Sequence, residues 1–146
     1  MLVYKLPRSK TTARKVALWR KLKKLGVYAV QDSICVLPLS EKNLETFEWI
    51  ASELRETGGE ASVWEASTLT VSQEREMRDH FLDQVNVQYR RIVQEAASIL
   101  DEEGLRQLWA RFNRVRAQDY LKSPLAMEAR AACERRAIEF REEERN

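Results

Sequence analysis

Two hydrophobic periods alternate along the first 66 residues. Short apolar runs rich in β-branched and aromatic residues predict four strands, at residues 2–6, 27–30, 34–37 and 61–66. Apolar residues at helical spacing predict helices at 13–25, stopped by Gly26, and after Ser40, where the helix ends at Thr57-Gly58-Gly59. The order strand, helix, strand, strand, helix, strand is that of a ferredoxin-like βαββαβ domain.

After residue 67 the pattern is helical throughout. One long helix to about Leu100 is predicted by an apolar stripe at Met77, Phe81, Val85, Ile92, Ala96 and Ile99. A second helix follows Gly104, and Ser123-Pro124 precedes an Ala-rich third helix that packs along the long helix or projects as an arm. The predicted class is therefore α+β, with a ferredoxin-like domain at 1–67 and an α-helical extension of about three helices at 68–146.

Composition narrows the class of protein. The chain has 146 residues, of which 44% are hydrophobic and 33% charged, which is typical of a globular protein. No run of about 18 apolar residues and no signal-peptide layout occurs, so we predict no membrane span and a cytoplasmic location. Cys35 and Cys133 lie far apart with no further ligand at metal spacing, and both are interpreted as reduced thiols, Cys35 as a buried one.

The net charge of +2 hides a basic segment at the start of the chain, where residues 1–40 hold nine basic residues and one acid, Asp32. A helical wheel places Leu18, Trp19, Leu22 and Leu25 on one arc. The candidate nucleic-acid-binding residues are the cations opposite that arc, those flanking the helix and two in the later basic helix, namely Lys5, Arg8, Lys10, Arg14, Arg20, Lys21, Lys24, Arg111 and Arg114. Cations on one helix face suit phosphate contact, with binding that falls as salt rises. The alternative is that these cations only solvate the surface.

Catalytic patterns are nearly absent from the sequence. His80 is the only histidine, so neither a two-histidine metal site nor a conventional catalytic triad is easily assembled. There is no G-x-G-x-x-G or Walker loop to cradle phosphates. We therefore predict no enzymatic activity, no cofactor and no metal site.

Several segments resemble the N-terminal domain of the chromate-resistance regulator ChrB. They are residues 2–7, 12–26, 31–38, 58–66 and 111–120. The resemblance implies a bacterial, cytoplasmic, chromate-responsive regulator of transcription, with chromate or another oxyanion as a possible partner. Full-length members of that family carry a further C-terminal chromate-resistance domain that this sequence does not include, so the chain is either an excised domain or a short homologue.

Residues 3–39 are more distantly similar to the small CRISPR-associated ferredoxin-like nuclease and to the related domain of the PaaX repressor. In the nuclease, the first strand ends in an aspartate that binds metal at a dimer interface. The matching residue here is Lys5, which would repel Mg²⁺. This resemblance implies a shared fold and a homodimer without the nuclease chemistry.

Three functional hypotheses follow. The first is a regulatory module that dimerises through its sheet and contributes a basic surface to DNA binding. The second is a metal-dependent nuclease, which Lys5 disfavours. The third is a protein-interaction and dimerisation domain, in which Trp49, well off the apolar stripe of its helix, is partly exposed and sits at a contact.

Overall fold

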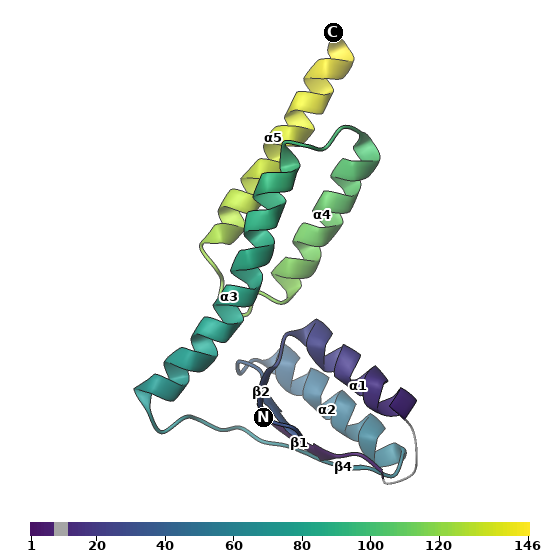
Figure 1. Cartoon of the computed structure of the whole chain (residues 1–146), viewed down its shortest axis with the longest axis vertical. Coiled ribbons are helices and arrows are strands. Elements are labelled where there is room, and N and C mark those ends of the chain that lie inside the picture. Colours follow the sequence, from purple (N-terminus) through teal and green to yellow (C-terminus); the bar gives the residue numbers. More distant parts are fainter. Residues whose placement is uncertain (8–11) are drawn as a thin grey trace. The chain divides into compact units, whose positions relative to one another are not determined.

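The computed structural model describes residues 1–7 and 12–146, and confirms the predicted α+β class. Within these residues the chain forms one four-stranded antiparallel sheet and five helices (Figure 1). The chain divides into two compact units, Met1–Met77 and Arg78–Asn146. The first unit contains the sheet, two helices and the start of a third, and the second is built from helices alone.

The sheet has the strand order β2-β3-β1-β4. Its strands are β1 (Leu2–Lys5), β2 (Tyr28–Gln31), β3 (Ile34–Val36) and β4 (Glu60–Val63). In the centre of the sheet, Leu2 of β1 pairs with Cys35 on one side and with Val63 on the other. Strands β2 and β3 form a hairpin whose register shifts between Ala29 and Gln31. The strands therefore lie where the apolar runs placed them, with ends that differ by at most three residues.

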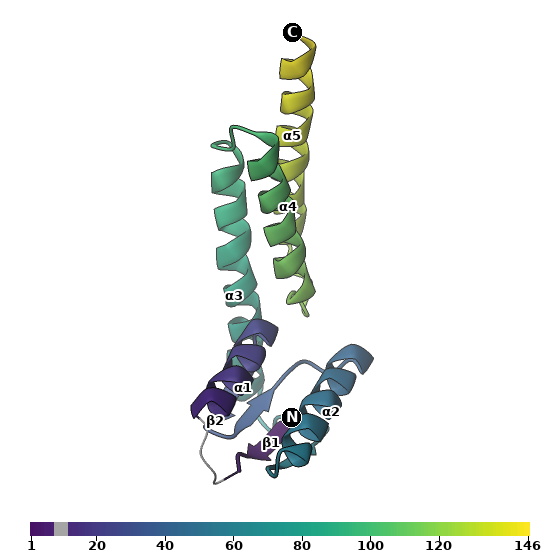
Figure 2. The same cartoon turned by 90° about the vertical axis from the view of Figure 1, so that its right-hand side faces the viewer.

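Helices α1 (Thr12–Leu25) and α2 (Glu41–Glu56) cover one face of this sheet (Figure 2). The core between the helices and the sheet consists of Leu2, Leu18, Leu22, Cys35, Leu37, Phe47, Ile50, Ala51 and Leu54. Helix α2 begins where the Ser40 hydroxyl accepts a 3.1 Å hydrogen bond from the Asn43 amide, as expected of an N-cap serine. It ends at Glu56 with Thr57 as its C-cap, and Gly58 follows with a φ of +87°, a conformation that glycine adopts without strain.

Helices α3 (Val71–Ala96), α4 (Glu102–Ala117) and α5 (Leu125–Arg145) follow the sheet. From Phe81 onward, α3 contributes the buried stripe Phe81, Val85, Tyr89, Ile92 and Ala96. The helical unit has a core of its own, formed by Val85, Tyr89, Ile92, Ala96, Leu108, Phe112, Val115, Ala129, Ala132 and Cys133. The second half of α5 extends past the ends of α3 and α4 (Figures 1 and 2). The first half of α5 is rich in alanine. Because the alanine side chain is small, the backbone of this half can pack closely against the rest of the helical unit.

A buried polar network fixes the connection between α4 and α5 against α3. The Tyr89 hydroxyl donates a 2.9 Å hydrogen bond to Oδ2 of Asp119, and the Ser123 amide donates to Oδ1 of the same carboxylate at 2.9 Å. The Ser123 hydroxyl in turn donates to Oδ1 of Asn86 and accepts from the Leu125 amide. Burial, together with the bond to Asp119, raises the pKa of Tyr89. Tyr89 thus brings a polar group into the core without leaving it unpaired.

Arg136 holds α5 to the loop that follows α3. Its Nε and Nη2 atoms donate hydrogen bonds of 2.9 and 2.6 Å to the Ile99 carbonyl, and its guanidinium lies 4.1 Å from the centre of the Phe140 ring. Helix α3 ends at Ala96, earlier than the apolar stripe predicts, so Ile99 belongs to this loop and its carbonyl is available to Arg136.

Cys35 is a buried thiol, as predicted, with 3% of its surface exposed. Burial raises its pKa from 9.0 to about 11. We therefore expect no labelling of Cys35 in the native chain by a disulfide reagent at about pH 8, where the thiol is neutral, and full labelling in denaturant. The pKa of the Cys35 thiol is higher in the folded chain than in the unfolded chain. The contribution of the neutral thiol to the free energy of unfolding is therefore complete below pH 9 and is lost as the pH rises to about 11. Rapid labelling of Cys35 in the native chain would contradict this assignment.

Candidate nucleic-acid interface

Helix α1 exposes its cations because it is buried through only a few residues. Leu18 and Leu22, one turn apart, are 8% and 5% exposed and anchor the helix to the core. All four candidate cations of this helix are exposed. Arg20 and Lys24 lie on the side opposite this anchor, whereas Arg14 and Lys21 lie at the edge of α1 next to α2. We call this set the α1 surface, and it consists of Arg14, Arg20, Lys21 and Lys24. The structure therefore leaves these four predicted residues exposed on α1, spread from its outer side to its edge next to α2.

Two members of the α1 surface are also held by α2. Lys21 Nζ lies 2.5 Å from Oε2 of Glu53, and the Lys21 side chain remains 52% exposed. Arg14 donates a long, 3.4 Å hydrogen bond to the Thr57 carbonyl. The Glu53 partner weakens the positive potential near Lys21, although an ion pair this exposed contributes little to stability.

A small hollow of about 140 Å³ lies between α1 and α2, next to these cations. Apolar side chains line much of it, including Leu18, Ile50 and Leu54, while Arg14 and Lys21 also contribute to its wall. The hollow is therefore a narrow apolar slit with cations beside it.

Trp19 lies on the apolar arc of the α1 wheel, but it is not buried with Leu18 and Leu22. The Trp19 side chain is 57% exposed, because Leu18 and Leu22 already provide the contact with the core. Lys23 Nζ lies 4.6 Å from the centre of the Trp19 ring, at the distance of a cation–π contact. An exposed aromatic ring thus accompanies the cations of α1, a combination suited to nucleic acid.

The remaining candidate residues are distributed over both units. Lys5 is exposed at the end of β1, where it pairs in register with Glu60 of β4. Arg8 and Lys10 lie outside the described residues. Arg111 and Arg114 belong to α4, in the helical unit, where Arg114 is exposed and Arg111 forms an ion pair with Glu95 of α3.

Arg91 of α3 joins Arg111 and Arg114 at one hollow, and sequence reasoning missed it. The signal in the sequence is the doublet Arg90-Arg91. Only the packing of α3 against α4 determines which of the two faces α4, and a helical wheel of α3 alone does not contain that information.

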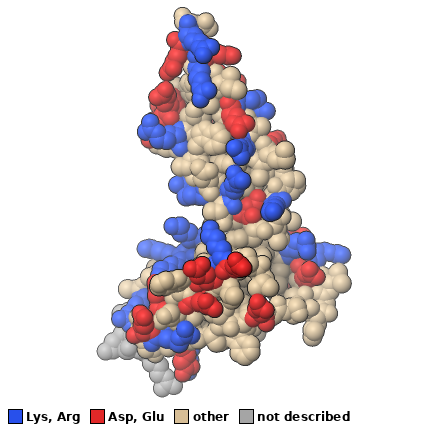
Figure 3. All heavy atoms as spheres, turned by 180° about the vertical axis from the view of Figure 1, so that it is seen from behind, with Lys and Arg blue, Asp and Glu red and all other residues tan. Residues whose placement is uncertain are grey.

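Charges of both signs are interspersed over the face of the molecule shown in Figure 3. Across residues 1–7 and 12–146, no group of three or more His, Cys, Asp or Glu side chains is arranged to hold a metal ion. The His80 ring makes an edge-to-face contact with Phe81, at 5.1 Å between ring centres. None of the helices in the described part of the chain is long and apolar enough to cross a membrane.

These observations define an α+β protein that displays cations on an exposed helix. Residues 15–103, more than half of the chain, match the family model described as Protein ChrB, N-terminal, and the chain belongs to this family. Membership indicates a regulatory role in chromate resistance in bacteria. No curated protein and no solved structure gives a significant match to the chain.

Proposed function

We propose that this chain is a regulatory module of a chromate-resistance system that dimerises and contributes a basic surface to DNA binding in the bacterial cytoplasm. The observation that carries this proposal is the α1 surface, a set of four exposed cations on a helix that is anchored through Leu18 and Leu22. Cations arranged in this way contact the phosphate backbone and supply affinity, whereas base-specific contacts would come from other groups.

The fold and the family support the proposal. The strand order β2-β3-β1-β4 is consistent with a ferredoxin-like domain at about residues 1–67, followed by the helical extension at 68–146. Val3 pairs with Ile34, and by strand alternation both side chains lie on the sheet face opposite to Leu2 and Cys35. These half-buried apolar residues support self-association through the sheet.

The direct test is a gel-shift titration of the chain with promoter fragments from its own operon at low salt. We expect retention of the promoter fragment and progressive release as salt increases, since phosphate contacts dominate the affinity. A fragment of equal length from an unrelated gene is the control for sequence preference. If no promoter fragment is retained even at low salt, the chain does not bind DNA by itself and the proposal is wrong.

Trp49 favours a second candidate function, that of a protein-interaction domain, because it is 67% exposed on α2, as predicted. Light scattering separates the two. We expect a dimer whose mass is unchanged in Trp49→Ala and halved in Ile34→Lys, with circular dichroism showing that both variants fold. A monomeric Trp49→Ala variant, combined with no retention of the chain on heparin, would favour the interaction domain instead.

Chromate or another oxyanion remains a proposed partner of this chain. Arginine suits such ligands, because its planar guanidinium donates two parallel hydrogen bonds to one oxyanion. The three arginines at the α3–α4 hollow are the observation that supports this partner class.

A further inference from the structure

We propose that the slit between α1 and α2 binds a small organic monocarboxylate whose apolar part is about the size of one six-membered ring. The slit has a volume of about 140 Å³. An apolar cavity of about 150 Å³ is large enough to hold benzene. The apolar lining comes from three segments of the first unit, with Leu6 and Pro7 after β1, Ala17 and Leu18 on α1, and Ile50 and Leu54 on α2.

The walls of the slit are held in place by the core and by a close approach of the chain. Leu18, Ile50 and Leu54 are buried, so the same side chains that pack in the core also form the wall. The Gly59 amide donates a 2.9 Å hydrogen bond to the Leu54 carbonyl, and a β-carbon at position 59 would lie only 3.3 Å from Cδ of Pro7. The slit is therefore preformed, and a ligand loses little affinity to the ordering of its walls.

The charges beside the slit fit a monocarboxylate. Arg14 donates a hydrogen bond to the Thr57 carbonyl that is long, at 3.4 Å, so the carboxylate of a ligand is a stronger acceptor for this guanidinium. Lys21 pairs with Glu53 at the same wall. Two positive charges and one negative charge leave a net charge of +1, which one carboxylate would neutralise.

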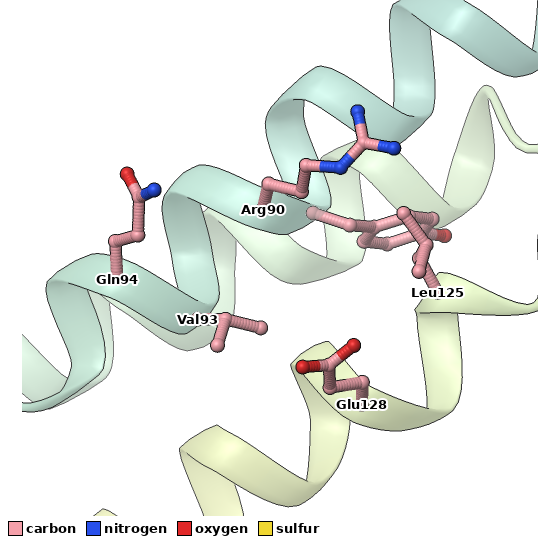
Figure 4. Close-up of a pocket in the computed structure, with 6 residues that line it drawn as sticks. Arg90, Val93, Gln94, Leu125 and Glu128 are labelled. Atoms are coloured by element: carbon pink, nitrogen blue, oxygen red, sulfur yellow. The ribbon is translucent and has the colours of Figure 1, made fainter.

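The hollow between α3 and α5 in the helical unit provides a contrast (Figure 4). It is larger, at about 220 Å³, and Val93 and Leu125 provide apolar walls. Arg90 on α3 and Glu128 on α5 bring one charge of each sign to it, and these charges cancel. A carboxylate ligand therefore gains less in this hollow than in the slit, although the hollow has more room.

This inference goes beyond the proposed contact with DNA, because it assigns a small-molecule ligand to apolar walls that phosphate contact does not use. Arg14 and Lys21 belong both to the slit and to the α1 surface. Ala17 lines the slit but is not part of the α1 surface, so a substitution at Ala17 separates the two proposals.

The test is a titration of the whole chain with benzoate, followed through methyl signals in nuclear magnetic resonance spectra. We expect the signals of Leu18, Ile50 and Leu54 to shift, and those of Val93 and Leu125 in the contrasting hollow to stay unchanged. The expected dissociation constant is on the order of 1 mM, which is ordinary for a ligand of about ten non-hydrogen atoms.

Two further compounds separate the contributions of the ring and of the charge. Benzamide has the same ring without the charge and is expected to bind about tenfold more weakly, because it loses the charged hydrogen bonds. Acetate has the charge without the ring and is expected to leave the methyl signals of the slit unchanged.

Two pairs of variants test the residues of the slit. Ala17→Phe fills the slit and is expected to abolish benzoate binding with DNA affinity unchanged, whereas Ala13→Phe, an exposed position of α1 outside the lining residues, is expected to bind benzoate normally. Arg14→Gln is expected to weaken benzoate binding by about tenfold, the loss of one charged hydrogen-bonding partner. Lys15→Gln removes an exposed charge outside the lining residues and is expected to change nothing. Circular dichroism checks that every variant folds.

Three results would overturn the inference. They are unchanged slit signals at about fifty times the expected dissociation constant, where the site would be nearly full, equal binding of benzoate and benzamide, and equal binding of benzoate by Ala17→Phe and Ala13→Phe. Benzoate binding in a chain that retains no promoter fragment would contradict the proposed function and leave this inference standing.

Discussion

Reversing the charge of the α1 surface is expected to lower the affinity of the chain for duplex DNA by about a hundredfold at near-physiological salt, because about four phosphate contacts are lost. The variant replaces four residues by glutamate, namely Arg14, Arg20, Lys21 and Lys24. All four are exposed, so the core formed by Leu18 and Leu22 is not disturbed. Fluorescence anisotropy of a labelled duplex measures the loss.

The matched control reverses four exposed arginines of α5 and so changes the net charge by the same amount. They are Arg130, Arg135, Arg141 and Arg145. We expect this control to lose less than about tenfold in affinity, because long-range repulsion is screened within about 10 Å at ordinary ionic strength. Equal losses in the two variants would show that net charge alone controls binding and that the α1 surface has no special role. A companion variant with glutamine at the four α1 positions tests the same contacts without the repulsion between position 21 and Glu53.

Asp119→Ala is expected to destabilise the helical unit by about 3 kcal/mol, because two buried donors lose their acceptor. The Tyr89 hydroxyl and the Ser123 amide both donate to this carboxylate at 2.9 Å, and Tyr89 is 0% exposed. Without Asp119 the connection between α4 and α5 also loses its hydrogen bond to Tyr89 of α3 and keeps the bond between Ser123 and Asn86. Urea unfolding followed by circular dichroism and by amide hydrogen exchange of α3 to α5 measures the effect.

Two variants make the interpretation of that loss specific. Asp119→Asn keeps an acceptor oxygen and is expected to lose less than half as much stability as Asp119→Ala. Asp83→Ala removes an exposed carboxylate from the same bundle and is expected to change stability by less than about 0.5 kcal/mol. If Asp119→Ala were as stable as Asp83→Ala, the polar network would contribute nothing to the fold.

The sequence predicts much of the fold because the two hydrophobic periods are clear. Leu2 and Cys35 lie in strands that are buried on one face, and Phe47 and Leu54 repeat at helical spacing. The apolar stripe predicted for α3 omits Tyr89, which is buried in the structure. The burial of a tyrosine depends on a hydrogen-bond partner for its hydroxyl group. That partner, Asp119, lies 30 positions away in the chain, and local periodicity contains no information about it.

The candidate site was predictable in its charge but not in its geometry. The basic character of α1 follows from residue order, so Arg20 and Lys24 could be placed on one face. The ion pair between Lys21 and Glu53, and the grouping of Arg91 with the α4 arginines, depend on how separate helices pack. The exposure of Trp19 could not be predicted for the same reason, because a wheel gives the side of a helix but not how much of that side the sheet covers.

The measurement that tests the DNA-binding proposal most directly is the slope of the logarithm of the binding constant against the logarithm of salt concentration. It is determined with one duplex for the unmodified chain, for the α1 charge-reversal variant and for the α5 control. We expect the α1 variant to have a slope shallower than that of the unmodified chain by about 3 to 4, the value for four phosphate contacts, and the control to match the unmodified chain. Identical slopes for all three proteins would show that the α1 surface does not contact DNA.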